Sequence, residues 1–184
     1  LVNPSVMFRR ELLARHGGYR DGDFPEDYEL WLRWLEAGVR MGKVPRTLLR
    51  WNDSPGRLTR RDARYAPDAF FRLKAVWIAR WLAEAGGSAG RSIFVWGAGR
   101  HTRKRAAHLE ARGTRISGYV DVDVKKTGRG IGGTGLPVIA PGDLPAPGGI
   151  FVLGYVTTRG ARENIRAHLT SRDYIEGRDF LMCA

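Results

Sequence analysis

Short apolar runs alternate with amphipathic stretches along the second half of the chain. The first run, residues 92–96, is followed by a turn with two glycines and then by the helical pattern of residues 101–112. Short apolar runs bounded by turn residues are typical of buried strands, and alternation of strands with helices is typical of a parallel sheet covered on both faces. The pattern therefore predicts an α/β domain. Its further expected elements are strands at 116–120, 150–153 and 180–183, the last at a sheet edge, and a helix at 159–169.

Helical periodicity dominates the first half. Tyr28, Trp31, Leu32 and Leu35 have the i, i+3, i+4, i+7 spacing of a helix with one buried face, and Gly38 follows as a stop signal. We therefore expect mostly helices with short strands. The other elements expected here are strands at 5–8 and 44–49, a helix at 10–16 ended by Gly17 and Gly18, a polar, basic loop at 52–61, and a long helix that opens at 66–68.

The composition changes at residues 85–90, Ala-Gly-Gly-Ser-Ala-Gly, between the long helical pattern and the first strand of the second half. Small, flexible residues of this kind are typical of linkers between domains. A chain of 184 residues is long enough for two small domains. We therefore expect one domain at residues 1–87 and a second at residues 88–184.

The overall composition is that of a globular protein, with 43% apolar and 27% charged residues. No apolar run reaches the roughly 18 residues that a membrane-spanning helix needs. Cys183 is the single cysteine, so the chain can form no internal disulfide, which fits a reducing cytoplasm. The chain opens with Leu-Val-Asn-Pro and shows no signal peptide. We expect a cytoplasmic protein whose true N-terminus lies upstream.

A formal net charge of +12 is spread over both halves, since residues 1–87 carry 16 basic and 11 acidic side chains and residues 88–184 carry 15 and 8. Such a charge favours anionic partners, which include nucleotide diphosphates, nucleic acids and anionic membrane surfaces. The sequence contains no RNA-binding, helix-turn-helix or zinc motif, and we therefore expect no nucleic-acid partner.

Two adjacent carboxylates, Glu26 and Asp27, stand where the helix around Trp31 is expected to begin. Acidic residues at this place stabilise a helix through its dipole, by about 0.3–1 kcal/mol each. A carboxylate on a rigid helix end beside a Gly/Asp/Pro loop is also well placed to act as a general base, and the dipole favours its ionised form. Both interpretations stay open on these residues alone.

An ordered set of segments favours the catalytic interpretation. The segments are Asn-Pro-Ser-Val-Met-Phe-Arg-Arg from Asn3, Gly-Gly-Tyr from Gly17, Glu-Asp-Tyr-Glu-Leu-Trp-Leu-Arg from Glu26, Val44-Pro45, and Leu-Leu-Arg-Trp from Leu48. Together they resemble the second, acceptor-side half of a family 2 glycosyltransferase with the GT-A fold, over residues 1 to about 85. The resemblance implies that Asp27 is the catalytic base. It would deprotonate an acceptor hydroxyl, which then attacks the anomeric carbon of a nucleotide sugar with inversion, while Glu26 helps to position the acceptor or the motif.

The segment from Arg50 to Arg60 resembles the loop that, in this family, folds over the donor diphosphate. Arg50, Arg57 and Arg60 suit that role, because a planar guanidinium makes paired, charge-assisted bonds to phosphate oxygens. A solvated basic loop is the alternative. Many members of the family have a histidine near the metal in this loop, whereas this chain has Asn52 and Asp53.

The resemblance places the nucleotide and its divalent metal, Mn²⁺ or Mg²⁺, on the first half of the fold, through an Asp-X-Asp motif. Asp21-Gly-Asp23 has that spacing but lies in the acceptor loop, and Asp121-Val-Asp123 lies in the other domain. We therefore expect the metal ligands mostly outside this chain, and no sugar transfer by this chain without the missing N-terminal half. The implied partners are a nucleotide sugar and a glycan or lipid-linked acceptor, in bacterial cell-surface polysaccharide or glycoconjugate synthesis.

A second candidate site follows the first strand of the second domain. Gly97 and Gly99 permit a tight turn and the approach of a phosphate to a helix N-terminus, and Asp121, 22 residues after Gly99, stands where dinucleotide-binding domains place an acid for a ribose hydroxyl. Thr102 replaces the third glycine of that fingerprint, which is expected to widen the helix–strand contact. The segment resembles Rossmann-like domains appended to some bacterial sugar-modifying enzymes and glycosyltransferases. The alternative function is thus a nucleotide-binding or regulatory module without transferase activity.

Aromatic and basic residues share the long helix at residues 70–82. Such a helix suits a membrane interface, which would make the protein peripheral at the inner face of the membrane. Packing in a protein core is the alternative, with the stripe Phe70, Leu73, Trp77 and Trp81 buried.

Overall fold

The computed structural model describes residues 3–50, 52, 54–84, 88–128, 130–131 and 134–184. The chain divides into two compact units, Leu1–Trp77 (unit 1) and Ile78–Ala184 (unit 2). This division falls within the long helix α4, Pro67–Glu84, whereas the sequence predicts a boundary between residues 87 and 88. Residues 85–87 of the expected linker lie outside the described residues, so that boundary stays a prediction.

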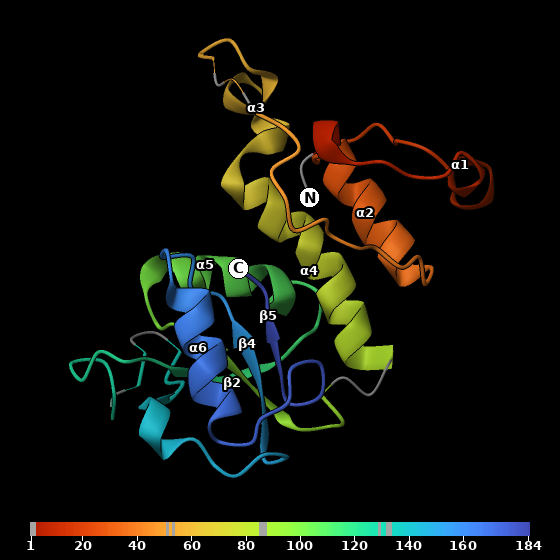
Figure 1. Cartoon of the computed structure of the whole chain (residues 1–184). Helices are drawn as coiled ribbons and strands as arrows, with labels where there is room; N and C mark the ends of the chain where they lie inside the picture. The colour runs from red at the N-terminus through yellow and green to blue at the C-terminus, as the bar shows by residue number, and fades with distance from the viewer. Residues whose placement is uncertain (1–2, 51, 53, 85–87, 129, 132–133) are drawn as a thin grey trace. The chain divides into compact units, whose positions relative to one another are not determined.

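Unit 2 is built on a parallel β-sheet with five strands in the order β3-β2-β1-β4-β5 (Figure 1). The prediction of an α/β domain is confirmed, and so is the edge position of the last strand. The short strand β3 was not predicted. The elements are β1 (Ser92–Trp96), α5 (Arg100–Glu110), β2 (Ile116–Val120), β3 (Val138–Ile139), the 3-10 turn η3 (Pro141–Asp143), β4 (Ile150–Gly154), α6 (Ala161–Thr170) and β5 (Phe180–Met182).

The three central strands end at the same level. Trp96, the last residue of β1, is aligned with Val120 of β2 on one side and with Gly154 of β4 on the other. Because the strands are parallel, the loops that follow them meet at one edge of the sheet. The strand order reverses between β1 and β4, and sheets of this kind bind ligands in the crevice at that point.

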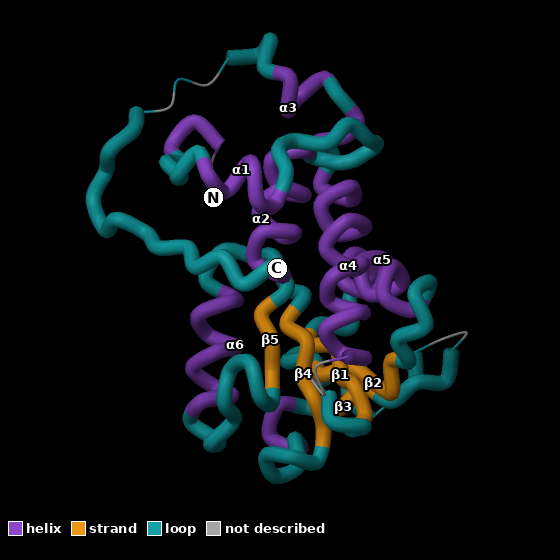
Figure 2. Tube along the Cα trace, turned by 90° about the vertical axis from the view of Figure 1, so that its right-hand side faces the viewer, coloured by secondary structure: helices purple, strands orange, loops and turns teal. Residues whose placement is uncertain are grey.

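Helices cover both faces of the sheet. Alternate residues of a strand point to opposite faces. Val152 of β4 packs in a cluster with Ile165 and Leu169 of α6, whereas the ring of its neighbour Phe151 lies 5.7 Å from that of Trp81 in α4. Figure 2 shows α6 on one side of the sheet and α5 on the other. This arrangement confirms the predicted two-sided cover.

The described residues of unit 1 form helices joined by loops, with no strand. The predicted helix at 10–16 is confirmed as α1, and Gly17, with φ 76°, ends it. The predicted strands at 5–8 and 44–49 are wrong, because residues 3–50 contain no strand. A short apolar run forms a strand only beside another strand that satisfies its backbone groups. The elements are η1 (Asn3–Ser5), α1 (Glu11–His16), α2 (Glu26–Glu36), α3 (Leu58–Arg61), within the predicted loop, η2 (Ala63–Tyr65) and the start of α4.

Helix α2 confirms the expected helix but buries a different face. Its buried apolar residues are Leu30, Trp31 and Trp34, whereas Leu35 is half exposed, at 51%. Phe8 packs edge-on against Trp34, with ring centroids 5.0 Å apart. The prediction selected the buried face from the spacing of apolar residues alone. In the structure the charged Glu29 is also buried and occupies one position of that face.

Helix α4 confirms the long helix that opens at Pro67. Its buried stripe is displaced by one residue from the predicted one, since the buried side chains include Phe71, Ala75, Ile78 and Leu82, and of the predicted set only Leu73 is buried. Among the described residues, no helix is long and apolar enough to cross a membrane. Contact of α4 with a membrane surface stays a prediction.

Candidate functional site

The Glu26-Asp27 pair lies in the first turn of α2, as the sequence predicts. Pro25 precedes the helix with φ −65°, a value that suits the entry to a helix, and no side chain caps the helix. Glu26, Asp27 and Glu29 bring three carboxylates to this turn, where the free backbone N–H groups and the helix dipole favour negative charge.

Asp27 is half-buried. Its Oδ1 accepts a hydrogen bond of 2.7 Å from the backbone N–H of Tyr28. Burial, and to a smaller extent the neighbouring charge of Glu26, raise the pKa of Asp27 above its ordinary value, although hydrogen bonds from the backbone act in the opposite direction. The helix dipole was expected to favour the ionised form, but removal from water outweighs the groups that favour it. The result is a carboxylate with increased affinity for a proton.

Glu26 has a different environment. The hydroxyl of Tyr65, 39 residues further along the chain, donates to its Oε1 at 2.7 Å and to its Oε2 at 2.5 Å. Burial and the hydrogen bond to Glu26 raise the pKa of Tyr65 to about 12, so its hydroxyl keeps its proton as a donor. Tyr65 ends the turn η2, which Asp62 caps by accepting from the Arg64 N–H at 2.9 Å. The segment after the predicted donor loop is therefore fixed to the Glu26-Asp27 motif.

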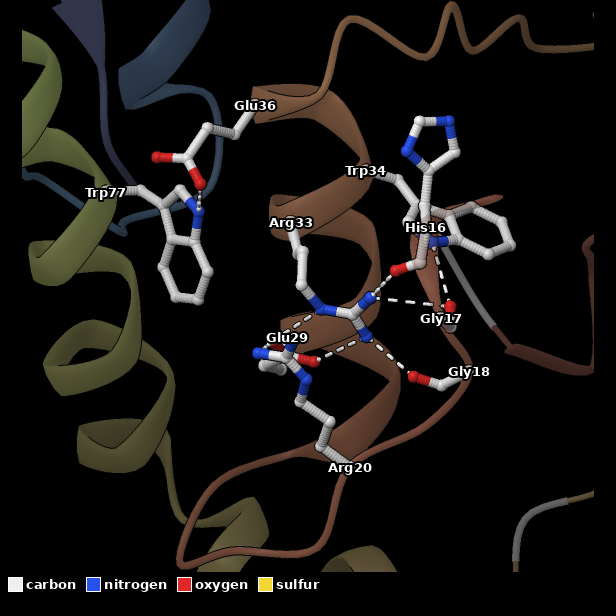
Figure 3. A network of polar contacts seen from close by, with 9 residues as sticks. All are labelled: His16, Gly17, Gly18, Arg20, Glu29, Arg33, Trp34, Glu36 and Trp77. Carbon is white, nitrogen blue, oxygen red and sulfur yellow. Dashed lines mark hydrogen bonds and ion pairs between the residues drawn. The ribbon is translucent and has the colours of Figure 1, made fainter. Parts of the chain in front are cut away.

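A polar network fixes the segment before the motif (Figure 3). The side chain of Arg33 is only 11% exposed, and its guanidinium donates to both carboxylate oxygens of Glu29, at 2.9 and 3.1 Å, and to the carbonyl of Gly18 at 2.6 Å. It also donates to the carbonyl of His16. Since α2 holds the backbone at residues 16–18 through Arg33, the loop that leads to Glu26 has a fixed starting point.

The three predicted diphosphate ligands lie along the segment before η2. Arg50 is exposed, Arg57 immediately precedes α3, and Arg60 lies in the last turn of α3. The Arg60 N–H donates to the Arg57 carbonyl at 3.0 Å, which is a backbone contact and does not bring the guanidinium groups together. Trp51 and Asp53 of the same segment lie outside the described residues. The role of the three arginines stays a prediction.

A cavity of about 470 Å³ adjoins this region of unit 1. Its lining carries charges of both signs, and Arg72 crosses to the carbonyl of Asp23 at 2.6 Å. Over the part of the chain that the structure describes, no group of three or more His, Cys, Asp or Glu side chains could hold a metal ion. The charged lining residues are Asp23, Asp62, Arg64, Asp68 and Arg72.

Unit 2 presents a second candidate site at the carboxyl ends of its strands. Gly97, with φ 106°, turns the chain after β1, and an added Cβ would lie 2.8 Å from Val156 and 2.9 Å from Thr102. Thr102 was expected to widen the helix–strand contact, but it is buried and fills the space beside Gly97. Gly99, with φ −70°, precedes α5, and an added Cβ there would meet nothing within 4 Å. Gly97 is thus required for packing, whereas Gly99 faces open space.

Asp121 is buried and holds the turn in place. Its Oδ2 accepts from the Ala98 N–H at 2.7 Å and its Oδ1 from the Asp123 N–H at 2.9 Å, and Lys126 Nζ lies 3.2 Å from Oδ2. Burial favours the neutral acid, but these hydrogen bonds and the lysine charge outweigh it and lower the pKa of Asp121. The carboxylate therefore joins the loop after β2 to the turn after β1. If Asp121 also binds a ribose hydroxyl, as the sequence predicts, it does so in addition to these three contacts.

Gly97, Gly99 and Asp121 line one crevice of about 530 Å³. The structure thus brings the three predicted residues together at the point where the strand order reverses. One face of α6 forms another wall, and the sequence did not single it out. The spacing i, i+3, i+4, i+7 within the predicted helix could have shown this face. Its residues are Ala161, Asn164, Ile165 and His168.

Comparisons with protein-family models, with curated proteins and with solved structures found no match to this chain.

Proposed function

We propose that unit 1 is the acceptor-side part of the active centre of an inverting glycosyltransferase, with Asp27 as its general base. The observation that carries this proposal is the difference between two adjacent carboxylates. Both side chains are half-buried, but both oxygens of Glu26 accept from the Tyr65 hydroxyl, whereas Oδ1 of Asp27 accepts from the backbone N–H of Tyr28. Neighbouring carboxylates in different environments are typical of sites that give them separate roles.

In the proposed reaction, Asp27 accepts the proton of an acceptor hydroxyl while the hydroxyl oxygen forms a bond to the anomeric carbon of the sugar. The bond between that carbon and the diphosphate oxygen breaks, and its electron pair leaves with the nucleoside diphosphate. Attack from the side opposite the leaving group inverts the configuration at the anomeric carbon. The raised pKa of Asp27 suits the role, because a stronger base accepts the proton more readily.

Glu26 and the arginines have supporting roles in this proposal. Tyr65 holds Glu26 at the start of α2, where the carboxylate keeps the motif in position. Arg50, Arg57 and Arg60 are the proposed ligands of the donor diphosphate. The acceptor is a glycan or a lipid-linked glycan, in the synthesis of cell-surface polysaccharide or glycoconjugate.

The resemblance also implies Mn²⁺ or Mg²⁺, which would offset the charge on the leaving diphosphate. The described residues do not fit such a centre, because they contain no group of carboxylates, histidines and cysteines able to hold a metal ion. No step of the proposed reaction is therefore assigned to a metal held by this chain. The resemblance places those ligands, with the rest of the donor site, on a half of the domain upstream of this sequence.

The test is a transfer assay on the protein translated together with its upstream sequence. UDP-, GDP- and dTDP-sugars are offered with glycan and lipid-linked acceptors, and the product linkage is analysed by NMR. Transfer with inverted anomeric configuration supports the proposal. Retained configuration, or no release of nucleoside diphosphate from any donor, would contradict it.

The crevice of unit 2 favours a second candidate function, the binding of a phosphate-bearing ligand. It lies where the strand order reverses, and Gly99 leaves open space at the N-terminus of α5, a helix of 11 residues whose first turn contains no acidic side chain. Free N–H groups at such a helix end attract phosphate. Titration calorimetry of the chain with pyrophosphate tests this function. A dissociation constant in the micromolar to low millimolar range supports it, whereas no heat of binding at several millimolar pyrophosphate contradicts it.

A further inference from the structure

The wall of the crevice that α6 forms is chemically different from the turn at Gly99. Ala161 and Ile165 give it apolar surface, and Asn164 and His168 stand on the same helix face. Within the described part of the chain, the side-chain amide of Asn164 makes no hydrogen bond, so its donor and acceptor are both available. A largely apolar surface with a few polar groups is the usual lining of a small-molecule site.

His168 is held in a fixed orientation. Its Nε2 lies 3.2 Å from the carbonyl oxygen of Pro141, and its ring meets that of Trp96 edge-on, with centroids 5.4 Å apart. A carbonyl oxygen can only accept, so this contact favours the tautomer with its proton on Nε2. Nδ1 is then an acceptor. The Asn164 amide, on an exposed side chain of the same helix face, gives the wall one donor group and one acceptor.

The charged residues of the crevice compensate each other. Lys126 Nζ lies 3.2 Å from Asp121 and 3.4 Å from Asp123, so the loop opposite α6 adds no unpaired positive charge. Val122, on that loop, lines the crevice with a side chain that is 73% exposed. The walls away from α5 therefore suit an uncharged, planar group with polar edges and apolar faces better than they suit a second phosphate or a sugar ring.

From this lining we infer that the α6 wall binds the nucleobase of a nucleotide, with Asn164 as the residue that hydrogen-bonds the edge of the base. The inference rests on the second candidate function, because the phosphates of the same nucleotide would lie at Gly99. A volume of about 530 Å³ lies within the range of sites that enclose ligands of this size.

The test separates the base from the phosphates. The full chain is titrated with pyrophosphate, with ADP and UDP, and with the nucleosides adenosine and uridine, by calorimetry and by amide NMR shifts. At least one of the two diphosphates is expected to bind about tenfold or more tightly than pyrophosphate, and its nucleoside alone is expected to shift the signals of Asn164 and His168. Asn164→Ala should lower the affinity for that nucleotide about fivefold, the effect of one hydrogen bond, and leave the affinity for pyrophosphate unchanged.

Thr170→Ala is the matched control, since Thr170 is an uncharged, exposed residue of the same helix that does not line the crevice. It should change neither affinity. If pyrophosphate binds as tightly as both nucleotides, the phosphate site stands and the base wall is refuted. If the nucleosides shift the α6 signals but pyrophosphate does not bind, the base wall stands and the phosphate site at Gly99 is refuted. If Asn164→Ala and Thr170→Ala have equal effects, Asn164 does not bind the base.

Discussion

The Tyr65 hydroxyl donates to both carboxylate oxygens of Glu26, at 2.7 and 2.5 Å, across 39 residues of sequence. The contact joins the segment after the predicted donor loop to the first turn of α2. It also gives the two carboxylates different environments, because among the described residues Glu26 accepts from a side-chain hydroxyl and Asp27 accepts from the backbone. The predictions on unit 1 start from this relationship.

Tyr65→Phe should weaken the attachment of this segment to α2. A hydrogen bond to a charged group is worth about 1.5–3 kcal/mol, and we expect a loss of about 1–2 kcal/mol because the pair is only partly buried. The measurement is the opening free energy of the α2 amides by hydrogen exchange. Tyr19→Phe is the control, since the Tyr19 hydroxyl reaches Asn3 at an exposed site and should cost under about 0.5 kcal/mol. Equal effects of the two variants would contradict the proposed role of the Tyr65 contact.

Asp27→Asn should stabilise unit 1 at neutral pH. The pKa of Asp27 is raised in the folded protein, so the folded state binds more protons than the unfolded state between the ordinary value of 3.8 and the folded pKa. Stability therefore falls as pH rises through this window, and the deficit persists above it. The asparagine variant lacks this deficit. The measurement is urea unfolding of both proteins at several pH values. The stability of the variant minus that of wild type should be larger near pH 7 than below pH 3.8, and a smaller difference near pH 7 would refute the raised pKa.

Asp179 should be essential for the stability of unit 2. Its side chain is buried. Arg91 donates to its Oδ1 at 2.9 Å, and two nitrogens of Arg178 donate to its Oδ2 at 2.8 and 2.9 Å. Breaking a buried pair from one side leaves an uncompensated charge, so we expect Asp179→Ala to cost about 3 kcal/mol or more. The exposed pair of Arg166 and Glu176 provides the control, and Glu176→Gln should cost under about 1 kcal/mol. Urea unfolding followed by circular dichroism distinguishes the two.

The same residue predicts an acid limit for unit 2. Burial favours neutral Asp179, but its hydrogen bonds with Arg178, the Ile175 N–H and Arg91 outweigh burial and lower its pKa. A lowered pKa contributes stability that is complete above the ordinary value of 3.8 and is lost as pH falls through the folded pKa. Below pH 4, the free energy of unfolding should therefore fall more steeply with decreasing pH in wild type than in Asp179→Asn. The same pH dependence of the unfolding free energy in both proteins would show that Asp179 does not cause it.

Two glycines of the same turn should respond differently to alanine. Gly97→Ala forces a side chain into positive φ and against Val156 and Thr102, and should cost about 1–3 kcal/mol. Gly99→Ala has a common φ and open space, so it should leave stability within about 0.5 kcal/mol of wild type while it weakens pyrophosphate binding. Thermal unfolding and calorimetry on the two variants check this. Unchanged pyrophosphate binding in Gly99→Ala would remove Gly99 from the proposed phosphate site.

The sequence predicted unit 2 more closely than unit 1. β1 and β2 have the predicted bounds, because each is a five-residue, mostly buried run between turn signals, which leaves little ambiguity. The strand β3 has two residues, too few for a periodicity to appear. In unit 1 the apolar runs at 5–8 and 44–49 resemble strands, but whether they pair depends on neighbours that the local pattern does not contain. The buried stripe of α4 is displaced by one residue because packing partners, not spacing, select the face.

The candidate sites were predictable only in part. Glu26, Asp27, Gly97, Gly99 and Asp121 were recognised from short-range patterns, and their backbone positions agree with those patterns. The contact from Tyr65 to Glu26 joins residues far apart in sequence, and no local signal indicates it. The sequence also could not show that Thr102 packs beside Gly97, or that Asp121 is held by the Ala98 N–H. Such contacts are set by the tertiary fold.

The most direct test of the proposed function is the rate of sugar transfer by Asp27→Asn, in the protein translated with its upstream sequence and with the donor and acceptor that the transfer assay identifies. Loss of a general base typically lowers a rate by about 100- to 10,000-fold, and we predict a fall of that size with an intact fold. Glu11→Gln, a change at an exposed acid of α1, should retain at least about half of the wild-type rate. Near wild-type turnover in Asp27→Asn would contradict the assignment of Asp27 as the base.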